Sequence, residues 1–140
     1  MPASSKTKTQ PALTAAKFLQ ALKGKPSGEN TKDNPAGRTL GVPMASVFKL
    51  AKAHMAMPLK EIEKLLESEF YEARMGAVSI MDFLARDKKT TSELRKQLFD
   101  LYIKRHDRIN NWSLVDRSAP HVVGGYLNDK PRKILYKLAR

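Results

Sequence analysis

The fold is decided by the stretch from residue 71 to residue 86, which reads YEARMGAVSIMDFLAR. Ala77, Met81 and Leu84 recur at helical spacing and form one apolar stripe. Phe83 is apolar but falls outside that stripe, so this helix is apolar on more than one side. We therefore predict that residues 71–86 form a central helix covered by other helices.

Amphipathic helices are predicted on both sides of this segment. Pro43, Pro58 and Pro131 stand at the expected helix starts, because proline suits the first turn of a helix. A short helix is expected over residues 11–23, and Pro120 is expected to bend or end a helix unless it begins a new one. Successive helix pairs are expected to cover residues 43–67, 71–106 and 112–139. The fold class is therefore all-α: stacked antiparallel pairs are typical of an α-solenoid, with a compact helical bundle as the alternative.

Composition limits the chemistry that this chain can perform. The 140 residues are enough for one domain, and the absence of cysteine excludes disulfides and thiolate metal sites. The three histidines lack the spacing of metal ligands, so we expect no metal and no cofactor. No apolar run approaches the roughly 18–20 residues that cross a bilayer. We expect a cytoplasmic monomer, associated with the nucleoid if the source is bacterial.

Charge is distributed unevenly along the chain, whose net charge is +12. Residues 43–87 have a net charge of −1, whereas the part before them carries +5 and the part after them +8. We interpret residues 1–41 as a mostly flexible basic N-terminal arm with one short helix, and residues 42–140 as a helical repeat domain. A basic surface favours polyanions through counterion release, although a solvated lysine-rich surface would have the same composition.

Trp112 and Asp116 are the best candidates for a functional pair. They are four residues apart, which places both on one face of a helix, and the surrounding charges are mostly basic. Separately, the tryptophan would usually be a packing residue and the aspartate a partner of a nearby arginine. The cations that we consider for phosphate contact are Lys104, Arg105, Arg108, Arg117, Arg132 and Lys133. For the cluster over residues 104–108, the alternative role is a favourable interaction with a helix C-terminus.

The region from about residue 40 to residue 140 resembles the DNA alkylation repair family, the HEAT-like-repeat alkylpurine DNA glycosylases. The resemblance begins at Gly41-Val42-Pro43 and continues through residues 71–77, Tyr-Glu-Ala-Arg-Met-Gly-Ala. Its most specific block is residues 109–116, Ile-Asn-Asn-Trp-Ser-Leu-Val-Asp, followed by Ala119-Pro120 and Gly124-Gly125.

This resemblance implies a solenoid of HEAT-like helix pairs whose concave, basic side holds duplex DNA with alkylated bases. It implies excision of cationic N3- and N7-alkylpurines. In the family, the residues that match Trp112 and Asp116 lie at the active site. The aspartate stabilises positive charge on the deoxyribose as the glycosidic bond breaks, and the tryptophan packs on the sugar.

Three differences from the family pattern affect the expected activity. The N-terminal helices of the family are shortened, with a linker rich in Gly, Pro and Asn at residues 24–37 in their place. Ser113 stands where the family block usually has an aspartate. The family also continues past the position of Arg140 with helix pairs that supply an arginine and a second tryptophan. We therefore expect an apparently truncated family member with weak excision, or one completed by a second polypeptide. The alternatives are a non-catalytic duplex-DNA-binding HEAT-like module or scaffold, and a helical repeat that binds only proteins.

Overall fold

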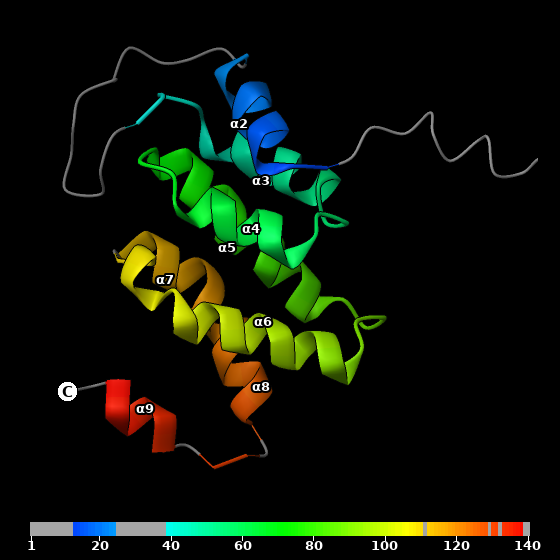
Figure 1. The fold of residues 1–140 in the computed structure, drawn as a ribbon, viewed down its shortest axis with the longest axis vertical. Coiled ribbons are helices and arrows are strands. Elements are labelled where there is room, and N and C mark those ends of the chain that lie inside the picture. The colour runs from blue at the N-terminus through cyan, green and yellow to red at the C-terminus, as the bar shows by residue number, and fades with distance from the viewer. Residues whose placement is uncertain (1–12, 25–38, 111, 129, 132, 139–140) are drawn as a thin grey trace, which may run out of the picture.

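The computed structural model describes residues 13–24, 39–110, 112–128, 130–131 and 133–138, and its regular elements in this part of the chain are helices (Figure 1). The all-α class predicted from the sequence is confirmed. In chain order the elements are α2 (Ala15–Lys23), α3 (Met44–Ala53), α4 (Leu59–Leu66), α5 (Tyr71–Arg86), α6 (Ser92–Lys104), the 3-10 helix η2 (His106–Arg108), α7 (Trp112–Ala119), the π-helical turn η3 (Pro120–Gly124), α8 (Gly125–Leu127) and α9 (Lys133–Leu138). None of the described helices is long and apolar enough to cross a membrane.

The larger helices stack in two layers (Figure 1). One layer consists of α2, α4 and α6, and the other of α3, α5 and α7, with contacts between α4 and α5 joining them. Helix α3 therefore packs mainly on α5 and not on α4, its neighbour in sequence, so the expected pairing within residues 43–67 is not the main contact. The stacking in two layers is consistent with an α-solenoid.

Helix α5 is the centre of the protein, as its apolar pattern predicted. It packs against α3, α4 and α7, and every residue from 72 to 82 is buried. Small residues on α5 allow the close approach of its neighbours. Gly76 is the clearest case, because the ring of Phe18 in α2 occupies the space that a side chain at this position would need.

Two buried charged residues of α5 hold backbone groups. The Glu72 carboxylate accepts hydrogen bonds from the backbone N–H groups of Leu40, Gly41 and Val42, at 2.8, 2.8 and 3.2 Å. The Arg74 guanidinium donates to the backbone oxygens of Ser68 and Glu69, just after α4. These contacts fix the segment that leads into α3 and the turn that joins α4 to α5.

The short N-terminal helix is part of the packed core. Thr14 begins α2 by accepting a hydrogen bond from the backbone N–H of Lys17, as an N-cap residue does. Phe18 and Leu22 are completely buried against the rest of the molecule. The remainder of the predicted N-terminal arm, residues 1–12 and 25–38, lies outside the described residues.

Pro120 continues a helix and changes its winding. The backbone stays helical on both sides, with φ and ψ of −60° and −40° at Ala119 and −62° and −40° at Gly125. Proline lacks the N–H group of an α-helical bond, and its ring collides with the carbonyl four residues earlier. A wider π turn accommodates both effects. Consequently α7, η3 and α8 form one helical segment from residue 112 to residue 127.

Candidate functional site

A pocket of about 450 Å³ lies on the layer formed by α3, α5 and α7. Its lining residues come from α3, α5, α7 and η3. The lining residues that the structure describes are Met44, Phe48, Tyr71, Met75, Asp82, Arg86, Ser113, Asp116, Arg117, Pro120 and His121. Their spacing in α7 and η3, at 113, 116, 117, 120 and 121, is that of one helical face.

Asp116, the predicted catalytic carboxylate, is exposed and lines this pocket. It extends from the middle of α7, one turn after Ser113 and next to Arg117. Trp112 is the first residue of α7, which gives it the expected four-residue spacing on the helix; its side chain lies outside the described part of the structure. The structure therefore places the acid at a pocket and leaves the position of the indole ring as a prediction.

A second carboxylate, Asp82 of α5, organises the cations of the pocket. Its side chain is only 3% exposed, and Oδ2 lies 2.9 Å from Nη2 of Arg86 and 3.9 Å from Nη2 of Arg117. The other oxygen, Oδ1, lies 3.2 Å from Nδ1 of His121. A buried carboxylate is stable only when paired and hydrogen-bonded, and here residues of α5, α7 and η3 meet that need together.

Arg117 contacts two aromatic rings. Its guanidinium carbon lies 4.3 Å from the ring centre of Phe48 and 4.9 Å from that of Phe83. Its Nε also donates a hydrogen bond of 3.3 Å to the hydroxyl of Ser79. Cation–π contact with two rings and a hydrogen bond to Ser79 restrain the orientation of the guanidinium. The side chain remains 24% exposed, so it presents a preoriented positive charge at the pocket.

A second hollow of about 520 Å³ adjoins the first and shares Arg86 with it. It is predominantly basic. Its lining consists of Lys52, Met55, Phe83, Arg86, Asp87, Lys88 and Lys89. The Lys52 ammonium lies 5.0 Å from the Phe83 ring centre, so this one ring is contacted by cations from α3, α5 and α7.

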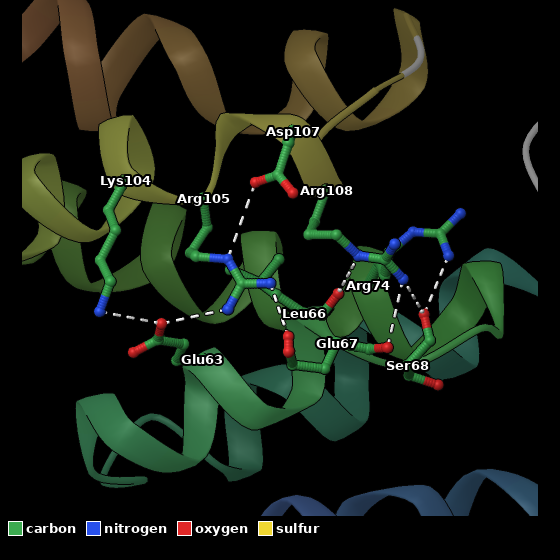
Figure 2. Close-up of polar contacts among 9 residues, drawn as sticks. All are labelled: Glu63, Leu66, Glu67, Ser68, Arg74, Lys104, Arg105, Asp107 and Arg108. Carbon is green, nitrogen blue, oxygen red and sulfur yellow. Dashed lines mark hydrogen bonds and ion pairs between the residues drawn. The ribbon is translucent and has the colours of Figure 1, made fainter.

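The predicted phosphate-binding cations at the end of α6 contact other parts of the protein (Figure 2). Lys104 lies 3.2 Å from the Glu63 carboxylate, and Arg105 bridges Glu63 and Glu67 at 3.1 and 2.6 Å. Arg105 hydrogen-bonds to both carboxylates, which lowers the pKa of Glu63 and of Glu67.

Arg108 also contacts α4, but through the backbone. It donates to the carbonyl oxygens of Leu66, Glu67 and Ser68, at 3.2, 3.2 and 3.3 Å. A cation at a helix C-terminus interacts favourably with the unpaired carbonyls there. Arg108 therefore has the alternative role considered for residues 104–108, an interaction with a helix C-terminus. The helix concerned is α4, however, and not α6, which precedes Arg108 in the chain.

The other predicted cations lie elsewhere. Lys133 is exposed on α9, and Arg132 lies outside the described residues. Among the predicted cations that the structure describes, Arg117 is the one that lines the pocket with Asp116.

Comparison with known families identifies one family for this chain. The sequence pattern of a family described as DNA alkylation repair enzyme matches residues 12–140. The chain belongs to the DNA alkylation repair enzyme family. Membership supports a role in DNA alkylation repair and suggests DNA as the partner, and the matched region includes α2. No curated protein and no solved structure matches the chain.

Sequence reasoning missed three residues of this family member's pocket: Asp82, Arg86 and His121. Asp82 and Arg86 have the i, i+4 spacing of a helical ion pair, which could have been noticed. The contact between His121 and Asp82 could not have been predicted from the sequence. The two residues are 39 positions apart, and only the packing of η3 on α5 brings them together. In the described part of the chain, no three His, Asp or Glu side chains are grouped as metal ligands.

Proposed function

We propose that this family member is a DNA glycosylase that excises cationic N3- and N7-alkylpurines from duplex DNA, with Asp116 as its catalytic carboxylate. The observation that supports this best is the position of Asp116, exposed at a pocket where preoriented cations gather. A carboxylate repels phosphate, so its presence among DNA-binding cations is explained if it stabilises a positive charge on the substrate.

Cleavage of the glycosidic bond requires little beyond the negative charge of this carboxylate. An alkylated purine is already a cationic leaving group, so no general acid is needed to break the glycosidic bond. The transition state resembles an oxocarbenium ion, as in other glycoside cleavage, and a nearby carboxylate lowers its energy electrostatically. Trp112 precedes Asp116 by one helical turn, and we assign its indole a packing contact with the sugar.

Arg117 is the cation that we assign to the DNA backbone next to the lesion. Its orientation is restrained by Phe48 and Phe83, and it is partly exposed at the same pocket as Asp116. Lys133 is exposed and can contribute to the attraction for phosphates. Lys104, Arg105 and Arg108 contact α4 instead, so we leave them outside the proposed interface.

The test is release of 7-methylguanine from alkylated duplex DNA, measured in single turnover with the protein in excess. Asp116→Asn keeps the shape of the side chain and removes its charge. We expect it to slow release by about 10²–10³-fold, the loss typical of removing one electrostatic stabiliser of a transition state. Asp100→Asn is the matched control, because Asp100 is an exposed carboxylate of α6 that pairs with Lys96. Release that survives Asp116→Asn unchanged would remove Asp116 from the mechanism.

The second candidate is a non-catalytic module that binds duplex DNA, which is favoured by Ser113 in place of the family's aspartate and by the basic second hollow. The same preparation decides between the two functions. Salt-dependent duplex binding without any base release supports the module, and release above the spontaneous rate supports the glycosylase.

A further inference from the structure

The pocket contains a histidine–carboxylate pair that the proposed role of Asp116 does not use. Resting on the proposed function, we propose that His121, oriented by Asp82, is a second catalytic residue, which accepts the proton of the water that attacks the sugar. The pair is formed by η3 and α5, and both residues line the pocket together with Asp116.

The hydrogen bond to Asp82 determines which ring nitrogen can act as a base. A carboxylate only accepts hydrogen bonds, so Nδ1 of His121, at 3.2 Å from Oδ1, carries the hydrogen. In the neutral imidazole the other nitrogen, Nε2, then has the free electron pair. Nε2 points away from Asp82, and because the side chain is 52% exposed, water can reach it.

The surrounding charges favour this arrangement. Asp82 already faces two permanent cations, Arg86 at 2.9 Å and Arg117 at 3.9 Å. The buried carboxylate therefore has two arginine partners besides the hydrogen bond from His121. Asp116 is the other acid at the pocket, and a carboxylate there stabilises an imidazolium once the proton has been transferred.

The histidine of this pair belongs to the π turn. Asp116 precedes η3 and His121 lies within it, and both line one pocket. A π turn within a helix is uncommon and is often associated with a functional site. Here it follows from Pro120, which lies between the two residues.

The reaction step balances as follows. The bond between C1′ and the purine nitrogen breaks, and its electron pair leaves with the base, which becomes neutral. The sugar cation, facing the Asp116 carboxylate, is attacked by the oxygen of water, and a new C1′–O bond forms. The water proton passes to Nε2 of His121, and the resulting imidazolium returns it to solvent through the exposed half of the ring.

The experiment is chemical rescue of His121→Ala. Single-turnover release of 7-methylguanine is measured for the full chain, for His121→Ala and for His121→Ala with added imidazole, together with duplex affinity. We expect a loss of about 10²-fold in the rate, within the range for general base catalysis. Duplex affinity should stay within twofold, and imidazole should restore part of the rate. His106→Ala is the control, because His106 is exposed and its Nδ1 contacts the Ile103 carbonyl instead.

Each outcome decides the matter. Loss with rescue supports the proposal. An unchanged rate in His121→Ala, with Asp116→Asn still impaired, overturns the role of His121 and leaves the proposed function standing. Loss without rescue, or loss together with weakened binding, assigns His121 to structure or DNA contact and also overturns the proposal. If the unsubstituted chain releases no base, the proposed function and the role of His121 both fail.

Discussion

At the scale of single residues, the contact between Gly76 and Phe18 joins the N-terminal helix to the core. A Cβ atom at position 76 would lie 2.4 and 2.5 Å from two carbons of the Phe18 ring, which is completely buried. Because the ring is buried in the core, we expect a larger residue at this position to displace α2 or distort α5. The sequence showed Phe18 and Gly76, but nothing in it indicated that they meet.

Gly76→Ala should therefore destabilise the protein although alanine favours helices. Overpacking of a core costs roughly 1–3 kcal/mol, against a gain of about 1 kcal/mol in helix propensity. We expect a net loss in the free energy of unfolding, measured by urea denaturation. In a Phe18→Ala background the space is open, so the same substitution should be stabilising.

Gly124→Ala is the matched control for this prediction. Gly124 is also helical, but the nearest atom to its added Cβ is the Ala119 carbonyl oxygen at 3.7 Å, an ordinary contact. We expect this substitution to be neutral or stabilising. If Gly76→Ala and Gly124→Ala have the same effect, the tight contact with Phe18 does not limit stability.

At the scale of helices, arginine side chains donate hydrogen bonds to the backbone carbonyls at the C-terminal ends of α4 and α5. Arg74 and Arg108 both donate to carbonyls at the end of α4, and Arg95 donates to those of Ala85 and Asp87 at the end of α5. The sequence shows that these residues are basic, but it does not show their partners. A helix C-terminus and a DNA phosphate both present oxygen acceptors, so composition alone cannot distinguish the two.

The contact between α4 and α6 should depend on pH. The hydrogen bonds from Arg105 lower the pKa of Glu63 and Glu67 below the ordinary value of 4.5. A carboxylate whose pKa is lowered by folding stabilises the protein above its unfolded-state pKa, and loses that effect as the pH falls through the folded-state value. We expect the free energy of unfolding to fall as the pH drops below 4.5, and this fall to be smaller in Arg105→Met.

Two comparisons make this pH prediction specific. Part of the acid loss should survive in Arg105→Met, because the pKa of Glu61 is also lowered, first by the backbone N–H of Ala15. Lys133→Met removes an exposed cation of α9 that pairs with no carboxylate in the described part of the chain, so it should leave the acid dependence unchanged. An identical pH profile for Arg105→Met and the unsubstituted protein would show that these ion pairs do not couple to folding.

At the scale of the whole molecule, hydrophobic periodicity predicted the helices and the central position of α5. It did not predict which helices face each other, because a layer of α3, α5 and α7 joins residues far apart in the chain. That layer forms the pocket. Asp116 could be predicted from the sequence because it belongs to a local motif, whereas other pocket residues could not. Asp82 was missed because two of its three partners, Arg117 on α7 and His121 on η3, approach it only in the folded protein.

The same layer gives the last prediction, which concerns where the duplex lies. In the described part of the chain Lys88 and Lys89 have no ion pair, and they line the basic second hollow, which shares Arg86 with the pocket of Asp116. Helix α5 between the two ends of this surface has 16 residues. At 1.5 Å per residue it is about 24 Å long, roughly seven base steps of about 3.4 Å each. A duplex centred on Asp116 can therefore reach both lysines.

Lys88→Gln with Lys89→Gln should weaken duplex binding and reduce the slope of log affinity against log salt concentration by about two, one for each lost phosphate contact. The control is Lys64→Gln with Lys96→Gln, which removes the same charge from lysines that pair with Glu61 and Asp100 on α4 and α6. This control double variant should leave the slope unchanged. In the same titration, Lys104→Gln tests whether the cation at the end of α6 contacts the duplex. If both double variants reduce the slope equally, the duplex responds to net charge alone and does not lie along the layer of α3, α5 and α7.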